Sequence, residues 1–218
     1  MRHVVLLMSV VFILAGCIST PKNAVSVTNV SAWRGKTVVL TERPRAGFMA
    51  TTPAKAMFAV AGAVAAISAG GSIVKENGIE DPAPRVAREL LQAAQQRYGV
   101  RPASLAPIKI DTTDTKALAS AAQGADLLID VQLISQQFVY FPTDWGHYRV
   151  FEGFVLRVID VHTGALLGGG KCGRDSSKDG PPPTYKEMLD HEAQLLKTIL
   201  TKETDSCRDE FLANLPPA

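Results

Sequence analysis

ADLLIDVQLISQQFVYFPTDWGHYRVFEGFVLRVIDV, residues 125–161, holds two long β-strand patterns around one turn. The first pattern, 125–141, contains a central apolar run, and the second, 148–161, places apolar side chains on one parity. Between them, residues 142–146 combine proline, aspartate and glycine, which is turn chemistry. We therefore expect an antiparallel hairpin.

A third strand is expected directly after this hairpin. Residues 160–164 form a second tight-turn pattern that ends in Gly164, and an apolar pair at Leu166 and Leu167 leads toward Cys172. The three strands together predict a three-stranded antiparallel meander.

Helical patterns lie on both sides of the meander. The best defined begins at Asp81-Pro82, a helix start, and stops at Gly99, which favours a left-handed end. Further patterns predict helices over 115–124 and 184–215 and short strands over 36–41 and 107–111. This order predicts an α+β or α/β fold, a small mixed sheet packed by helices with a long C-terminal helix.

Residues 56–74 form an alanine- and glycine-rich stretch of 19 residues without charge, between Lys55 and Lys75. Its large side chains fall mainly on one helical stripe, and Gly70-Gly71 interrupts the run. Three interpretations stay open: a helix packed on the core, a helix that docks on a membrane surface or partner, and a membrane span.

Composition limits the class of protein. The chain has 218 residues, 46% of them hydrophobic and 20% charged, with a net charge of +2. It is too apolar for a disordered chain and too charged for a polytopic membrane protein. Because no basic block stands out, nucleic acid is not expected as the main partner.

The first residues have the three parts of a secretory leader. A short basic start precedes the uncharged residues 4–14, and the small residues Ala15 and Gly16 stand before Cys17. This apolar stretch is shorter than the ~20 residues that a spanning helix needs.

Leu14-Ala15-Gly16-Cys17 resembles the lipobox of bacterial lipoproteins. The resemblance implies a diacylglyceryl group on the Cys17 thiol and cleavage just before it. The expected organisation is then a signal peptide over 1–16, a lipidated tether over 17–34 and one domain over 35–218. Ile18, rather than aspartate, follows the cysteine, so the resemblance favours the outer membrane, facing the periplasm. An ordinary secretory leader or an uncleaved anchor stays the alternative.

Lipidation of Cys17 would leave two cysteines, Cys172 and Cys207. Disulfides persist in oxidising compartments, so an even remainder favours a bridge between them. Buried free thiols are the main alternative, with a redox or metal role as a third.

Aromatic side chains concentrate at the predicted hairpin. Trp145 at the turn, with Phe141 and Tyr148 beside it, are the candidate partner-binding residues, because tryptophan and tyrosine are enriched at interfaces. Ordinary packing of the hairpin into the core is the alternative.

No pattern predicts catalysis, a metal site or a cofactor. The histidines of the mature chain, His147, His162 and His191, are not paired at metal-ligand spacing. Asp190-His191-Glu192 would diverge on a helix, and Gly168-Gly169-Gly170 lacks the residues of a P-loop. We therefore expect a protein that is not an enzyme.

Residues 79–170 resemble small periplasmic α/β lipoprotein domains. The features are the helix start at Asp81-Pro82, the run Gly124-Ala125-Asp126 entering a strand, and the turn at Thr163-Gly164. They are similar to those of curli-secretion lipoproteins, lipoprotein activators of penicillin-binding proteins and the amino-terminal domain of the translocation protein TolB. Neither pore formation nor synthase activation is implied, because residues 56–74 and the predicted bridge depart from these groups.

The leading hypothesis is a membrane-anchored, non-enzymatic lipoprotein that binds or helps to assemble cell-envelope components, with an envelope protein as partner. One alternative is a subunit of a homo-oligomeric membrane or secretion structure that uses residues 56–74. An envelope hydrolase is the second alternative.

Overall fold

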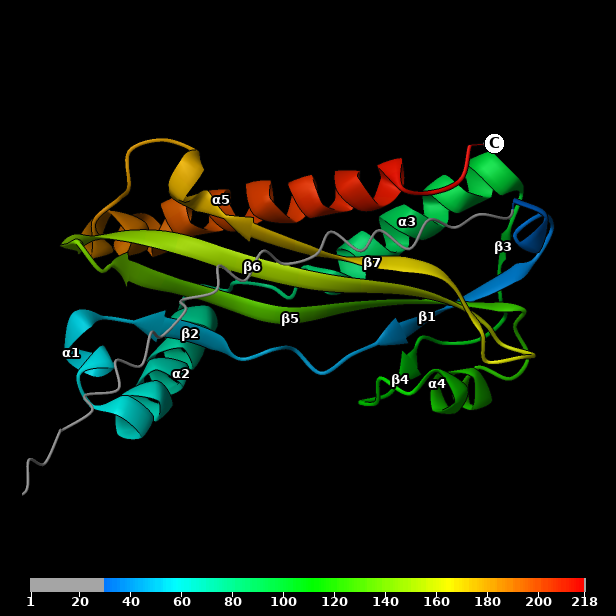
Figure 1. The fold of residues 1–218 in the computed structure, drawn as a ribbon, viewed down its shortest axis with the longest axis horizontal. Coiled ribbons are helices and arrows are strands. Elements are labelled where there is room, and N and C mark those ends of the chain that lie inside the picture. The colour runs from blue at the N-terminus through cyan, green and yellow to red at the C-terminus, as the bar shows by residue number, and fades with distance from the viewer. Residues whose placement is uncertain (1–29, 218) are drawn as a thin grey trace, which may run out of the picture.

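The computed structural model describes residues 30–217, and a long hairpin runs through its centre (Figure 1). β5 (Leu127–Phe141) pairs antiparallel with β6 (Asp144–Asp160), and β7 (Leu166–Asp175) pairs antiparallel with β6. The predicted meander is confirmed. Its first turn is tighter than predicted, because the register pairs Phe141 with Asp144 and leaves only two residues between the strands.

Four short strands extend the meander into a mixed sheet of seven strands. β1 (Thr37–Glu42) and β2 (Phe48–Thr51) both run parallel to β5, along different parts of its length. β3 (Arg101–Pro102) and β4 (Ile108–Lys109) run parallel to β1. The sequence predicted β1 and β4, whereas it did not predict β2 and β3.

Two helices cover one face of this sheet, α3 (Ala83–Tyr98) and α5 (Tyr185–Ala213) (Figure 1). Asp81 accepts a hydrogen bond from the Ala83 amide, and Gly99 ends α3 in the left-handed region at φ 66°. α5 begins with a capping box between Thr184 and Glu187 and is broken at residues 190–193, where the backbone leaves helical geometry. The mixed α/β fold with a long C-terminal helix is thus confirmed, with a kink inside that helix.

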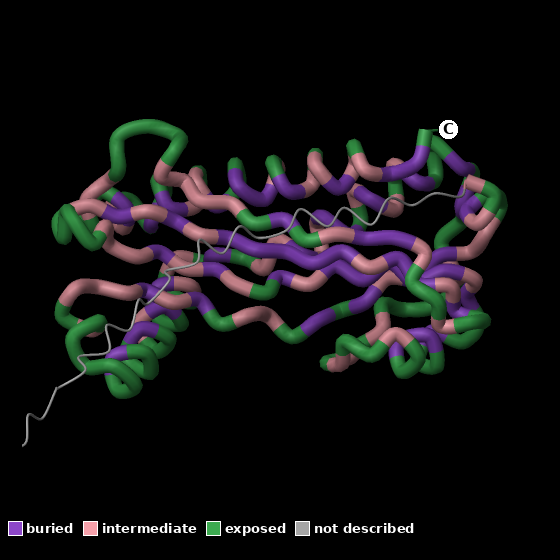
Figure 2. Tube along the Cα trace, viewed as in Figure 1, coloured by how far each residue is buried: buried purple, intermediate pink, exposed green. Residues whose placement is uncertain are grey.

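The buried residues of the sheet and these helices, coloured purple in Figure 2, form the main core. Trp33, just after the short 3-10 helix η1 (Val30–Ala32), is fully buried there and packs on Tyr98. A second cluster of buried residues near the hairpin tip joins Phe138 to β2 and α5. α4 (Thr115–Ala121) buries Leu118 against the other face of the sheet.

The remaining helices lie beside β2. α1 (Pro53–Ala56) and α2 (Ala59–Glu76) follow β2 in the chain, and α2 packs against that strand. The 3-10 helix η2 (Ser176–Lys178) lies between β7 and α5 in the chain. The predicted leader, Cys17 and the tether up to residue 29 lie outside the described residues.

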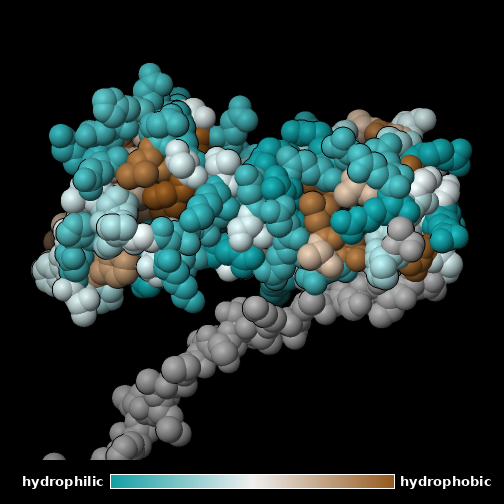
Figure 3. All heavy atoms as spheres, turned by 90° about the horizontal axis from the view of Figure 1, so that it is seen from above, coloured by the Kyte–Doolittle hydropathy of each residue, from teal (hydrophilic) through white to brown (hydrophobic). Residues whose placement is uncertain are grey.

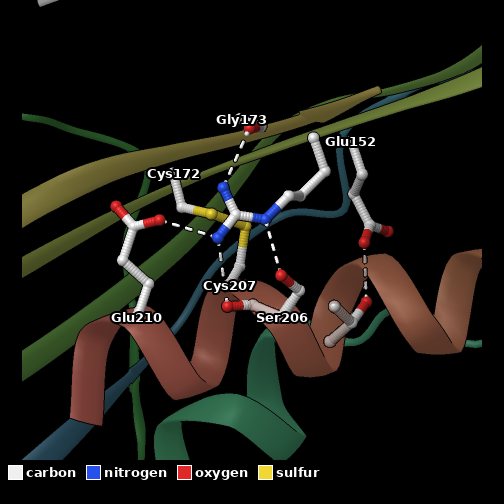
Figure 4. Close-up of a disulfide and its surroundings, with 8 residues drawn as sticks. Glu152, Cys172, Gly173, Ser206, Cys207 and Glu210 are labelled. Carbon is white, nitrogen blue, oxygen red and sulfur yellow. Dashed lines mark hydrogen bonds and ion pairs between the residues drawn. A yellow bond between two sulfur atoms is a disulfide. The ribbon is translucent and has the colours of Figure 1, made fainter. Parts of the chain in front are cut away.

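Cys172 on β7 and Cys207 on α5 are joined by a disulfide, with their Cα atoms 5.5 Å apart (Figure 4). The helical stripe that turns Cys207 toward the sheet was visible in the sequence. The pairing of these two cysteines is as predicted.

Candidate docking surface and buried polar groups

Large apolar side chains are exposed at one end of the molecule, which we call the apolar end. It consists of α1, the outward side of α2 and the turn between β5 and β6. β2 ends opposite Val139, so α1 follows close to that turn (Figure 1). Its most exposed members are Met57, Phe58, Val60, Val64, Ile67 and Trp145, and Val60 is 80% exposed. This concentration is unlike the scattered exposed apolar residues of an ordinary surface.

Small residues hold α2 against the protein. Its buried positions are Gly62, Ala66, Gly70 and Ile73. A Cβ atom on Gly70 would lie 1.9 Å from the Phe48 carbonyl oxygen, and one on Gly62 would lie 1.7 Å from that of Lys55. The backbone of α2 therefore approaches its neighbours more closely than any larger side chain would allow. The stripe of large side chains that the sequence shows faces away from the core.

The three aromatic candidates have different environments. Trp145 is 60% exposed, and its indole Nε1 donates to the Pro142 carbonyl. Phe141 lies under the Arg149 guanidinium, 5.2 Å from it. Tyr148 is buried and packs edge-on against Phe138, so only Trp145 presents most of its ring at the surface.

Seen from the α5 side, the surface is mainly hydrophilic, with hydrophobic atoms gathered in limited patches (Figure 3). Ion pairs join the two helices there: Arg85 of α3 binds Asp205 of α5 at 2.7 Å, and Arg208 binds Glu89 at 3.2 Å. The long helices are thus suited to water, in contrast with α2.

A buried ion cluster lies on the opposite face of the sheet from α3 and α5, on β1, β5 and β6. The Asp130 carboxylate is fully buried and accepts hydrogen bonds from Thr41 at 2.7 Å, from Arg43 at 2.7 and 2.8 Å, and from Arg157 at 2.7 Å. Burial acts to raise the pKa of Asp130, but the hydrogen bonds from Arg43 and Thr41 outweigh it and hold the pKa below its ordinary value.

A second polar group is buried between β6 and α5. Glu152 accepts hydrogen bonds from Gln136 and Thr204, each at 2.7 Å, and burial raises its pKa to about 7 (Figure 4). Glu203 lines the same cleft of about 770 Å³. Burial and a hydrogen bond with Asp179 raise the pKa of Glu203 to about 7. These carboxyl groups are therefore protonated more readily than surface carboxylates.

Arg174 lines this cleft beside the disulfide. Its guanidinium donates to Ser206 at 2.8 Å and to Glu210 at 2.7 Å, both on α5 (Figure 4). Together with the bridge from Cys172 to Cys207, it fixes β7 to the helix. The sheet edge and α5 thus form one rigid unit at this point.

The sequence interpretation overlooked Glu152 and Asp130. Glu152 has the same strand parity as Val150 and Phe154, and Asp130 stands inside the run from Leu127 to Val131. A charged residue on an inward parity is the signal that would have found both, because buried charges must be paired.

The histidines remain apart. His147 lies 2.6 Å from the Asp144 carboxylate at the hairpin turn, and His162 lies 3.2 Å from that of Asp126. His191 sits in the break of α5. Within residues 30–217 no group of three or more histidine, cysteine, aspartate or glutamate side chains is placed to hold a metal ion.

These features define a mixed α/β protein with large apolar side chains exposed at one end. No family model matches the chain, and no curated protein matches it. Among solved structures, it is similar to a PelC dodecamer from Paraburkholderia phytofirmans, at 14% identity over 91% of this chain and 96% of that one, with a TM-score of 0.36. It is also similar to lipoprotein GNA1162 from Neisseria meningitidis, at 11% identity over 78% and 99% of the two chains, TM-score 0.27. A third is a putative neuraminyllactose-binding hemagglutinin homolog from Helicobacter pylori, at 12% identity over 84% and 83%, TM-score 0.40.

Proposed function

We propose that this protein is a non-enzymatic, lipid-anchored component of the bacterial cell envelope, which binds envelope components through its apolar end. Acyl chains on Cys17 would hold it to the outer membrane with the folded part facing the periplasm. The string Leu14-Ala15-Gly16-Cys17 and the following Ile18 support this location. The bridge between Cys172 and Cys207 fits an oxidising compartment.

The apolar end is the observation that carries the proposal. Val60 is 80% exposed and Val64 64%, although burying such a side chain gains roughly 1.5–3 kcal/mol. A group of exposed apolar side chains of this kind at one end of a folded domain marks an interaction site. Binding through it would remove from water a surface that the fold itself leaves exposed.

The test is site-specific photo-crosslinking in native envelopes. A photoreactive residue at position 64 should give adducts with envelope components, whereas the same residue at Leu166, exposed on β7 at the other end of the hairpin, should give few. A Cys17→Ser variant reports whether the anchor is needed. Equal adducts at both positions would remove the apolar end as the binding surface. An unacylated amino terminus on soluble material would refute the location.

A second candidate function is a subunit of a homo-oligomeric envelope structure assembled through α2. The exposed alanines of α2, such as Ala61 and Ala65, would let a second helix approach closely. Ala61→Leu should then break a large assembly, measured by light scattering in mild detergent. Gly62 is unsuitable for this test, because it is buried against Lys55.

A further inference from the structure

The side chains of α2 are distributed in the opposite way to those of an ordinary surface helix. A helix on a soluble domain normally buries its large apolar side chains and exposes polar ones. Here the buried positions are mainly glycine and alanine, while Val60, Val64 and Ile67 face outward. Its remaining surface up to Val74 carries no charge. Such a helix is suited to a surrounding that is apolar on most sides.

We propose that the apolar end docks on a lipid bilayer, with α2 lying along the boundary between headgroups and hydrocarbon. The proposal rests on the envelope location proposed above and names the component that the apolar end binds. The protein would then hold the membrane at two places, through the acyl chains on Cys17 and through α2.

The connections of α2 exclude a membrane span. By length and composition α2 is long and apolar enough to cross a bilayer. However, β2 before it pairs with β5, and α3 after it packs on the same strand. Ile79, between α2 and α3, shares a core cluster with Phe48 of β2. The segments before and after α2 therefore belong to one folded domain, which keeps both ends of α2 on the same side of a membrane and leaves the helix along its surface.

The chemistry of the exposed side favours lipid over a protein partner. Protein interfaces combine an apolar centre with a polar rim and about one hydrogen bond per 100–200 Å². Between Lys55 and Lys75, α1 and α2 offer only Ser68 and Ser72 as polar side chains. Acyl chains require neither hydrogen bonds nor a fixed shape, and they can surround the whole outward side of the helix. Lys75 is exposed at the last turn of α2 and can reach anionic headgroups, whereas the Lys55 ammonium donates to the Ala50 carbonyl at 2.9 Å.

The hairpin turn adds an aromatic group to the same end of the molecule. Trp145 packs edge-on against Tyr140, and its indole Nε1 is held by the Pro142 carbonyl. Tryptophan and tyrosine are enriched where membranes meet water, because their rings are apolar with one polar group. Trp145 therefore extends the membrane-binding surface from α2 to the turn.

The tryptophans supply a direct assay. The chain has two, of which Trp33 is fully buried in the core and Trp145 is exposed. A change in fluorescence on adding vesicles therefore reports on Trp145. The test uses the chain from position 17 onward with Cys17→Ser and an oxidised Cys172–Cys207 bridge. The vesicles contain phosphatidylethanolamine and phosphatidylglycerol at three to one.

We expect this protein to sediment with the vesicles, with a blue shift and with quenching by brominated acyl chains. Trp145→Phe should abolish the shift, and Val64→Glu should lower the partition coefficient at least about tenfold. The matched control Leu166→Glu places the same charge on another exposed apolar position and should leave binding unchanged. Circular dichroism checks that each variant is folded.

Failure to sediment, or equal loss in both glutamate variants, would overturn the proposal. So would a soluble oligomer that Val64→Glu dissociates while vesicles are not bound, because α2 would then bind a second copy of the chain. If the purified protein binds vesicles but Cys17 is found unacylated in cells, the docking of α2 is supported and the lipid anchor is refuted. The two proposals can thus fail separately.

Discussion

Replacing Asp130 with asparagine should destabilise the fold strongly, because it leaves a buried guanidinium without its counter-charge. The Arg43 side chain is only 2% exposed, and two of its nitrogens bind the Asp130 carboxylate. Arg157 is 16% exposed and can recover some hydration, whereas Arg43 cannot. Removing one partner of a buried pair costs roughly 3–5 kcal/mol, a large part of the 5–15 kcal/mol that stabilises a typical domain.

Urea unfolding followed by circular dichroism measures this loss. The matched control is Asp205→Asn, which breaks the ion pairs with Arg85 and Arg208. Asp205 is 35% exposed, so its loss should cost about 1 kcal/mol or less. The reasoning is refuted if Asp130→Asn costs no more than the control.

Two further measurements keep this prediction testable if the single variant does not fold. The double variant Asp130→Leu, Arg43→Met removes both charges and should be more stable than Asp130→Asn alone. In the native protein the pKa of Asp130 is lowered, so its contribution is present above the unfolded pKa near 3.8 and is lost as the pH falls through the folded value. Acid should therefore weaken the native protein more than the double variant.

Three other predictions concern the second polar group, the bridge and α2. The folded pKa values of Glu152 and Glu203 are both raised from 4.5 to about 7, so the free energy of unfolding should fall as the pH rises from 4.5 to 7. Glu152→Gln should remove the share of this fall that Glu152 contributes, leave the share of Glu203, and gain roughly 3 kcal/mol at pH 8 in urea unfolding. A pH profile that is unchanged in this variant would contradict the buried, protonated Glu152 carboxyl. Replacing Cys172 and Cys207 with serine removes a bridge between residues 35 positions apart and should lower the free energy of unfolding by about 4 kcal/mol relative to the oxidised native chain. No loss of stability would show that the bridge is absent. Gly70→Ala should lower the free energy of unfolding by about 1–3 kcal/mol, because the new Cβ atom would clash with the Phe48 carbonyl. The control Gly71→Ala, whose Cβ atom would have nothing within 4 Å, should be neutral or stabilising. Equal effects of the two variants in thermal unfolding would contradict the close approach of α2.

The central fold could be predicted because its signals are local and periodic. Alternation along 125–161 fixes which side chains face the helices, and the stripe that carries Cys207 orients α5 toward the strand of Cys172. The additional strand β2 gives no such signal. It has four residues, and its place is set by pairing with Gln136–Val139, which are 88 positions further along the chain. Long-range pairing of a short segment is invisible to periodicity.

The buried charges show a different limit. The sequence contains Arg43, Asp130 and Arg157 far apart, and only the parallel pairing of β1 with β5 and the antiparallel pairing of β5 with β6 bring them together. Each charge alone would be too costly to bury. An interpretation of the sequence that considers only neighbouring residues therefore places these charged side chains at the surface.

The orientation of α2 cannot be predicted from the hydrophobicity of its side chains alone, because it also depends on how closely its backbone can pack. The stripe of large side chains in residues 56–74 predicts an amphipathic helix, and burial of that stripe is the usual outcome in water. The opposite stripe, however, holds Gly62 and Gly70, which let the backbone of α2 touch the carbonyls of Lys55 and Phe48. Close backbone packing through glycine is how helices associate where water does not reward burial of large side chains. The sequence therefore already distinguished the two sides, and the placement of the glycines, rather than the valines, decides which side faces the protein and which is left exposed.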